Sequence, residues 1–377
     1  MEQSCQNKSP KIAIVGGGPS GIYCAIHILE NFKKNNFNNF SLFIFDKGQI
    51  LRTILPTGGT RCNITNSISD IYDFASNYPR GEKFLYSIFS KHSNFDSLDF
   101  FKSIGIDTYT SSDNRIYPIS NSSSDVKNKL LNKLNSYKNF KLIHKKINSS
   151  AELKDFDYII ISSGSRKTEN LILSFNHKLV PFKKSLVGLK VENMSYPEGV
   201  CIKSLDGDFI FTKNGISGPL AFILSAKNIN ALYPYEINIK LFNENSLKEL
   251  ISRNPKKSIG NLVSAFVPKS FAHVIIENFH KKSAEVSRKE IENYSNLKLK
   301  ITGTETMGEI VNSGGVALNE LTNNCKSKIY DNLWFCGEIL DIDGLCGGFN
   351  LQNCWSTAYV VAKDVINTII NKKDKEN

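Results

Sequence analysis

The chain has 377 residues, of which 41% are hydrophobic, and its formal net charge is +11. This length and composition fit two or three folded domains and exclude a wholly disordered chain. The basic residues are scattered, so the charge predicts a solvated cationic surface, and a nucleic-acid partner is the minority interpretation. No apolar run approaches the length of a membrane span, so no membrane partner is expected.

The eight cysteines and six histidines form no motif for a metal or a dithiol. No C-x-x-C or H-E-x-x-H spacing occurs, so we expect no metal site. The polar N-terminus "MEQSCQNKSP" carries no signal peptide. We therefore expect reduced thiols in a cytosolic protein.

The first structural signal is a strand, a glycine turn and a helix. "KIAIV" (11–15) is rich in β-branched residues, "GGGPSG" follows it, and "IYCAIHILENF" has helical periodicity. The glycines of G-x-G-x-x-G permit a tight turn, the approach of a pyrophosphate and close packing of the helix, whose N-terminus attracts phosphate. An ordinary glycine-rich turn is the alternative. The predicted dinucleotide contacts are Gly16, Gly18, Pro19, Ser20 and Gly21.

The second predicted strand, "SLFIFD" (41–46), ends in an acidic residue. The carboxylate of Asp46 can accept hydrogen bonds from the hydroxyl groups of an adenosine ribose, and Lys47 follows it. The interval from the glycines is longer than usual because the polar "KKNNFNNF" intervenes. A simple turn residue is the alternative role for Asp46.

The C-terminal segment chooses between NAD and FAD. "LWFCG" is a predicted strand that ends at Gly337 and Glu338, and Gly347 and Gly348 precede a second long helix. FAD gives this second glycine turn a role, because Glu338 can bind ribityl hydroxyl groups and the helix N-terminus can face the ring edge that becomes negative on reduction. A strand and helix that only complete the sheet are the alternative.

A third segment lies between these two ends. "FDYIIISSGS" (156–165) is a predicted buried strand that ends near Ser163 and Gly164, and it returns the chain to the nucleotide. The preceding "FKLIHKKI" is a predicted edge strand, and we expect the backbone near Ile147 to meet the adenine.

Taken together, several motifs resemble the BaiN-like and aminoacetone-oxidase-like (YhiN-type) family of FAD-dependent oxidoreductases. They occur in the family's order over nearly the whole chain: "GGGPSG", "TGGTRCNITN", "NRIYPIS", "FIFTKNGISGPL", "NSGGVALNEL" and "LWFCGEILDIDGLCGGFNLQNCWS". The resemblance implies that the second motif lies along the flavin. It implies flavin contacts by Thr57, Gly58, Gly59, Arg61, Cys62 and Asn63, and by Gly337, Glu338, Gly347, Gly348, Asn350 and Leu351.

The resemblance also implies an α/β fold. It consists of a three-layer, Rossmann-like FAD-binding domain with glutathione-reductase-like βαβ units, interrupted by an inserted β-barrel with a helical subdomain. We expect the FAD domain at 1–175 and 314–377, the barrel at 176–245 and 296–313, and the helical insert at 246–295.

Three departures from the family pattern fall mostly near the expected substrate side. The stretch after Gly164 is shorter, Lys213 and Asn214 replace a histidine and an aromatic residue, and Thr60 stands where glycine is usual. No catalytic triad is expected, because a flavin performs the chemistry itself. Candidate catalytic residues are Cys62, Arg115, Tyr117 and Lys213, and for each a structural role is the alternative.

The leading hypothesis is a cytosolic oxidoreductase that transfers hydride between FAD and a small or hydrophobic organic substrate, with transient NAD(P)H or O₂ as electron partner. No second G-x-G-x-x-G for NAD(P) is present. One alternative is a flavoprotein that modifies or binds tRNA or another RNA. Another is a flavin-binding relic without full catalysis.

Overall fold

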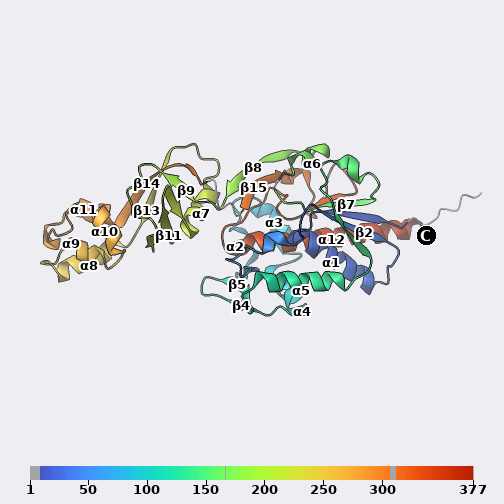
Figure 1. Cartoon of the computed structure of the whole chain (residues 1–377), viewed down its shortest axis with the longest axis horizontal. Helices are drawn as coiled ribbons and strands as arrows, with labels where there is room; N and C mark the ends of the chain where they lie inside the picture. Colours follow the sequence, from blue (N-terminus) through green and yellow to red (C-terminus); the bar gives the residue numbers. More distant parts are fainter. Residues whose placement is uncertain (1–8, 166, 306–310, 377) are drawn as a thin grey trace, which may run out of the picture. The chain divides into compact units, whose positions relative to one another are not determined.

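The structure is a computed structural model that describes residues 9–165, 167–305 and 311–376 (Figure 1). Two compact units are present: unit 1 contains residues 1–183 and 312–377, and unit 2 contains residues 184–311. Residues 306–310, within the predicted last barrel segment, and Cys5 lie outside the described residues.

Unit 1 is built on a five-stranded parallel sheet with the order β16-β7-β1-β2-β6. The strands are short and rich in β-branched and aromatic residues, and all but the edge strand β6 are largely buried, as expected for a parallel sheet. This confirms the predicted Rossmann-like α/β fold. The bounds are β1 (Lys11–Val15), β2 (Ser41–Asp46), β6 (Phe140–His144), β7 (Tyr158–Ile161) and β16 (Leu333–Phe335).

Two helices that are far apart in the sequence, α1 and α12, pack against each other in unit 1 (Figure 1). Shorter helices and a three-stranded antiparallel sheet of order β3-β5-β4 complete this unit. Local capping starts several helices; for example, Ser93 and Asp96 form a capping box. The helices are α1 (Pro19–Lys34), α2 (Ile71–Ala75), α3 (Glu82–Phe89), α4 (Asn94–Ser103), α5 (Ser123–Asn135), α6 (Glu169–Ser174) and α12 (Phe349–Glu376), and the strands are β3 (Thr65–Asn66), β4 (Thr108–Thr110) and β5 (Arg115–Pro118).

Unit 2 contains a six-stranded antiparallel sheet of order β10-β11-β12-β9-β14-β13. The turn that follows the outer strand β10 is bonded to the other outer strand, β13: the N–H of Leu205 donates to the carbonyl of Lys240 (2.9 Å), and the N–H of Lys240 donates to Asp206 (2.7 Å). Closure of this sheet into the expected barrel stays a prediction. The elements are β9 (Leu189–Val191), β10 (Cys201–Ile202), β11 (Phe209–Thr212), β12 (Gly215–Ser217), α7 (Pro219–Lys227), β13 (Tyr235–Lys240) and β14 (Asn296–Thr304).

Four helices of unit 2 share one apolar core with this sheet. They are α8 (Glu244–Arg253), α9 (Ile259–Val263), α10 (Lys269–Ile275) and α11 (Arg288–Ser295). The sequence predicts a longer helix over 269–282, but α10 ends early because Ile276 is extended and Phe279 packs onto Gly260. A Cβ on Gly260 would lie 2.2 Å from the Phe279 ring, so glycine is required there.

The chain leaves unit 1 along β8 (Leu179–Ser185) and returns along β15 (Val311–Val316), and these two strands pair with each other. Among the described residues, none of the helices combines the length and the apolar character that crossing a bilayer requires.

Candidate functional site

The N-terminus of α1 is open. Gly18 is the N-cap residue, and no side chain caps the helix. Within the described residues, the backbone N–H groups of Ser20 and Gly21 have no hydrogen-bond acceptor. A Cβ on Gly18 would have Thr53 as its nearest neighbour, at 3.8 Å. A Cβ on Gly21 would lie 1.9 Å from the Gly16 carbonyl oxygen, so this glycine is required for close packing. Free N–H groups beside open space at a helix N-terminus fit a phosphate.

The carboxylate of Asp46 holds the glycine turn. Its Oδ2 accepts the N–H of Gly17 and its Oδ1 accepts the N–H of Gly48, each at 2.7 Å. Gly16 is fixed as well, since its N–H donates to the Phe45 carbonyl at 2.8 Å. Asp46 therefore positions the turn, and its contact with a ribose stays a prediction.

The N-terminus of α12 is held by side chains from the 61–66 segment. The amide of Asn63, oriented to satisfy its neighbours, accepts the N–H of Gly348 (2.8 Å) and donates to the carbonyls of Thr65 (2.9 Å) and Ile116 (3.2 Å). Asn66 donates to the Gly347 carbonyl at 3.1 Å. The amide of Asn63 is thus used within the protein. These hydrogen bonds position Asn63 beside the glycine turn, and its contact with the flavin stays a prediction.

The strands that precede α1 and α12 end at the same edge of the parallel sheet. β1 leads to α1 and β16 leads to α12, and only β7 separates these strands. Two strand spacings amount to about 10 Å. The chain between them is tightly packed, since a Cβ on Gly337 would lie 2.3 Å from Ser20 Oγ, and the N–H of Gly337 donates to Thr357 at 2.9 Å.

Several buried polar atoms near this edge have no hydrogen-bond partner among the described residues. Ser163 Oγ, after β7, and Thr65 Oγ1, beside Gly348, are buried and have no hydrogen-bond partner among the described residues. The first-turn N–H groups of Phe349, Asn350 and Leu351 likewise have no acceptor there. Together with the α1 N-terminus, these donors fit an elongated ligand with phosphates at one end and a hydrogen-bonding ring at the other.

The loop of residues 57–62 is left-handed at four positions. The φ angles are +59° at Gly58, +64° at Gly59, +69° at Thr60 and +64° at Cys62. Glycine adopts this conformation without steric cost, but a β-branched threonine does not. The departure from the family at Thr60 therefore places a strained residue in the loop.

Arg61 lies against Tyr117. Its guanidinium is 4.2 Å from the centre of the Tyr117 ring, its Nη2 donates to the Tyr117 hydroxyl (3.2 Å) and its Nε donates to the Gly58 carbonyl (3.2 Å). Contact between Arg61 and a pyrophosphate stays a prediction. Burial raises the pKa of Cys62 to about 12, partly offset by a hydrogen bond with Thr57. This environment favours a packing role for the thiol, and a catalytic role for Cys62 stays a prediction.

Arg115 joins the same cluster. Its Nε is 3.2 Å from an Asp113 carboxylate oxygen. Burial, which alone would lower the pKa of Arg115, is outweighed by the Tyr117 hydroxyl and by Asp113, so this pKa is raised. Arg115 also acts electrostatically on Cys346, which lowers the pKa of a thiol that burial raises. A cluster beside the loop that leads into α12 thus contains Arg61, Tyr117 and Arg115.

Lys213, the fourth candidate, belongs to unit 2. It lies in the β11–β12 turn and lines a hollow of about 420 Å³ with Lys190, Met194, Asn214 and Thr302. A role for Lys213 at the cofactor stays a prediction.

The remaining predicted cofactor contacts occupy varied environments. Glu338 Oε1 accepts hydrogen bonds from Ser165 Oγ (3.0 Å) and the N–H of Asn312 (3.1 Å). The amide of Asn350 is bonded to both backbone groups of Gly344. Lys47 is exposed, whereas Ile147 and Leu351 are buried. Their contacts with the cofactor stay predictions.

Sequence reasoning missed two aspartates in "GEILDIDG". Asp343 is fully buried and forms a bidentate ion pair with Arg80. Asp341 Oδ1 is buried and has no partner among the described residues, and burial, followed by the nearby Asp343, raises the pKa of Asp341. The D-x-D spacing beside a glycine turn was the available signal, but Arg80 is 263 positions away.

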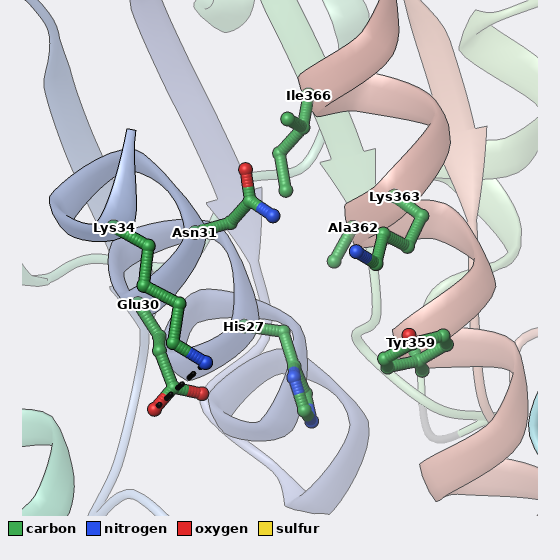
Figure 2. A pocket seen from close by; sticks show the side chains of 8 residues that line it. All are labelled: His27, Glu30, Asn31, Lys34, Tyr359, Ala362, Lys363 and Ile366. Carbon is green, nitrogen blue, oxygen red and sulfur yellow. Dashed lines mark ion pairs between the residues drawn. The ribbon is translucent and has the colours of Figure 1, made fainter. Parts of the chain in front are cut away.

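A cavity of about 180 Å³ lies between α1 and α12, away from the two N-termini. Figure 2 shows His27 on the α1 side of the cavity and Tyr359 and Lys363 on the α12 side, while Lys34 is paired with Glu30 of its own helix. His27 is eight residues beyond Pro19, about 12 Å along a helix. This cavity is therefore separate from the candidate cofactor site. Within the described residues, no cluster of three or more His, Cys, Asp or Glu could hold a metal ion.

The family model described as HI0933-like protein Rossmann domain matches residues 10–364. The chain belongs to this family. The match confirms the resemblance drawn from the motifs, and the family consists of FAD-dependent oxidoreductases. The chain is therefore an enzyme with FAD as its cofactor.

Similar curated proteins align over most of this chain. A 3-dehydro-bile acid delta(4,6)-reductase of Clostridium scindens is 25% identical, over 94% of this chain and 98% of that protein. A ribosomal RNA dihydrouridine synthase of Haemophilus influenzae is 23% identical, over 93% and 97%. Among solved structures, the Mycobacterium smegmatis Sdh1 complex in the apo form gives a TM-score of 0.48 at 10% identity, over 96% of this chain and 69% of that chain. This structural likeness is too distant to decide function.

Proposed function

We propose that this enzyme reduces a conjugated carbon–carbon double bond in an organic substrate. The observation that carries the proposal is the shared reaction class of its relatives. A delta(4,6)-reductase and a dihydrouridine synthase act on unlike molecules, yet both names describe the addition of hydrogen to a carbon–carbon double bond. Both proteins align with more than nine-tenths of this chain, so the common reaction is a better guide than either substrate.

The candidate site supports this chemistry. The α1 N-terminus and Ser163 would hold the pyrophosphate end of FAD, and the α12 N-terminus would face the ring edge that becomes negative on reduction. Bound FAD supplies a hydride acceptor and donor. The residues of this chain position the ring and the substrate and exclude water. We include in the proposal NAD(P)H as a transient electron donor, O₂ as a competing acceptor and a cytosolic location.

The experiment follows the electrons in two steps. The cofactor is released and identified, and the anaerobic holoenzyme is then mixed with NADH or NADPH while flavin absorbance is recorded. The reduced enzyme is next mixed with a cyclic enone, with uridine or with O₂. We expect the released cofactor to be FAD. The bound flavin should be reduced by either NADH or NADPH and reoxidised by an activated alkene. Reoxidation by O₂ alone would contradict the proposal, and a reduced flavin that nothing reoxidises would favour the catalytic relic.

A second candidate substrate class, RNA, is favoured by one feature of unit 2. Two lysine pairs are brought together there, because the N–H of Ser283 donates to the Lys257 carbonyl and the N–H of Ile259 donates to the Lys281 carbonyl, each at 2.9 Å. We call Lys256, Lys257, Lys281 and Lys282 the basic cluster. Lys281 is paired with Glu290 at 2.8 Å, whereas the other three lysines are exposed. Grouped lysines of this kind attract a phosphate backbone.

The RNA candidate is tested by retention of ribosomal RNA at increasing salt. A triple variant, K256E/K257E/K282E, should bind RNA at least tenfold more weakly and show a smaller salt dependence. The control, K203E/K227E/K298E, changes the net charge equally at exposed positions elsewhere in unit 2. Equal losses in the two variants would show that only net charge matters, and unchanged binding would remove RNA as a partner of this surface.

A further inference from the structure

The hydroxyl group of Tyr117 accepts a hydrogen bond but donates none to the described residues. Its oxygen accepts a hydrogen bond from Arg61 and interacts with the guanidinium of Arg115. Arg61 therefore contacts the phenol oxygen directly, and Arg115 is a second cation near it. The O–H itself has no acceptor among the described residues. A buried hydroxyl normally donates its proton to a partner, so this O–H is available to a ligand.

Strand geometry fixes this arrangement. In β5, Arg115 and Tyr117 are two residues apart, so their side chains leave the same face of the strand, and Ile116 faces the other way. β5 is held in place by β3, through the pairs Thr65 with Ile116 and Asn66 with Arg115. The position of Tyr117 is therefore set by a rigid sheet and not by a loop.

The same sheet connects Tyr117 with the α12 N-terminus. Thr65 contacts Gly348, where a Cβ would lie 2.4 Å from the Thr65 carbonyl, and Asn63 bonds both Ile116 and Gly348. Arg115 is close enough to Cys346, two residues before Gly348, to influence the pKa of its thiol. The phenol thus belongs to the end of the site where the redox-active ring is expected.

We propose that Tyr117 is the proton donor to the substrate, held between Arg61 and Arg115. The inference rests on the proposed function. Bound FAD, once reduced by NAD(P)H, would supply the hydride that one alkene carbon accepts. The Tyr117 proton goes to the adjacent carbon, the π bond breaks and two C–H bonds are formed. The phenolate is stabilised by the two guanidinium groups and regains a proton from water.

Arg61 also controls access to this group. Tyr117 is only 2% exposed and Arg61 covers its ring, while the Arg61 side chain itself is exposed. A long, flexible side chain can turn away from the ring when a substrate enters. The substrate then replaces the guanidinium on one face of the phenol, and Arg115 remains to stabilise the phenolate.

The test compares two acceptors in the Tyr117→Phe variant. Reduction of a cyclic enone needs a proton at carbon, whereas hydride addition to a nitroalkene yields a stable nitronate anion. We expect enone reduction to fall about 10²- to 10⁴-fold, with hydride transfer to the nitroalkene changed less than about threefold. The matched control is Tyr109→Phe, on the neighbouring strand, because the Tyr109 hydroxyl already donates to Asn121 at 2.7 Å.

Each outcome separates the inference from the proposed function. The FAD-to-protein ratio, the visible flavin spectrum and the Tm of each variant should match those of the wild type, which shows that loss of the phenol hydroxyl leaves the site intact. Equal losses with both acceptors, or undiminished enone reduction, would overturn the role of Tyr117. Wild-type enzyme that reduces neither acceptor would overturn the proposed function itself.

Discussion

The N-termini of α1 and α12 have similar glycine-rich sequences but different surroundings. At α1, Gly18 faces open space and no side chain caps the helix. At α12, Gly348 is pressed against the Thr65 carbonyl, and Asn63 and Asn66 bond the glycine pair. The hydroxyl of Tyr78 adds a hydrogen bond to the Phe349 carbonyl at 2.6 Å.

This difference shows that a glycine at a helix N-terminus can serve two purposes. Gly18 leaves room for a ligand, whereas Gly348 leaves room for the protein's own backbone. We expect the first end to receive a phosphate, whereas the second is already held by the protein's own groups. Substitutions should therefore separate cofactor affinity from stability.

The largest effect is expected from Gly348→Ala. Its φ of +93° disfavours any side chain, and the added Cβ would lie 2.4 Å from a backbone carbonyl that cannot move freely. We expect a loss of at least about 3 kcal/mol in the free energy of unfolding of the apoprotein. Urea denaturation followed by circular dichroism measures this loss.

Gly18→Ala is the matched substitution at the other helix. Its φ is −76° and its Cβ would have space, so we expect a change below about 0.5 kcal/mol in stability. FAD affinity should nevertheless fall at least tenfold, because the methyl group takes the place of a phosphate oxygen. If Gly18→Ala unfolds the apoprotein as much as Gly348→Ala, the two ends do not differ as described.

A second, smaller effect concerns the bracing of α12, by which we mean the hydrogen bonds from Asn63 and Asn66 to the glycine pair at its N-terminus. Asn63→Ala removes three hydrogen bonds and leaves buried backbone groups unsatisfied, so a loss of about 2–3 kcal/mol is expected. Asn66→Ala removes the bond to Gly347 and one to the Ile68 N–H, and about 1 kcal/mol should be lost. Thermal unfolding of both variants checks this order, and the reverse order would contradict the bracing role of Asn63.

Sequence periodicity was sufficient to predict the parts of this site that are formed by residues close together in the chain. The strand, turn and helix around Gly18, and the strand ends at Asp46 and Gly337, are each encoded within about ten residues. The bracing of α12 was not predictable, because Asn63 meets Gly348 only after the chain has folded. The same holds for Tyr117: its motif, which includes Arg115, was visible, but Arg61 meets it only after the chain has folded. The short antiparallel sheet that carries Tyr117 also escaped prediction, since its strands have only two to four residues.

Away from their N-termini, α1 and α12 enclose a buried histidine, His27, that makes the stability of the fold sensitive to acid. Burial, followed by the charge of His92 and Lys363, lowers the pKa of His27 from 6.5 to about 3. A histidine whose folded-state pKa is depressed stabilises the fold above pH 6.5, and this stability is lost as pH falls toward 3. At pH 5 the loss from His27 is about 2 kcal/mol relative to pH 7.

His27→Leu removes this titration next to the cavity of Figure 2, since Nε2 of His27 has no partner to lose within the described residues. The variant should lose less stability than the wild type between pH 7 and pH 5, as measured by urea midpoints. His144→Gln, at an exposed position on the edge strand β6, is the control and should follow the wild type. Identical pH profiles for all three proteins would rule out His27 as a source of acid sensitivity.

The smallest expected effect comes from the loop between the two helix N-termini, and it has the opposite sign. Thr60 is left-handed at φ +69°, and its hydroxyl only donates to the carbonyl of the preceding Gly59. Glycine relieves this strain, which is worth about 1 kcal/mol, although the greater flexibility of glycine in the unfolded chain offsets part of the gain. Thr60→Gly should therefore raise the Tm slightly. It should also keep the hydrogen bond from the Ser123 N–H to the carbonyl of residue 60, which measures 2.8 Å in this structure. A lower Tm would show that the threonine side chain stabilises the loop in a way that outweighs its backbone strain.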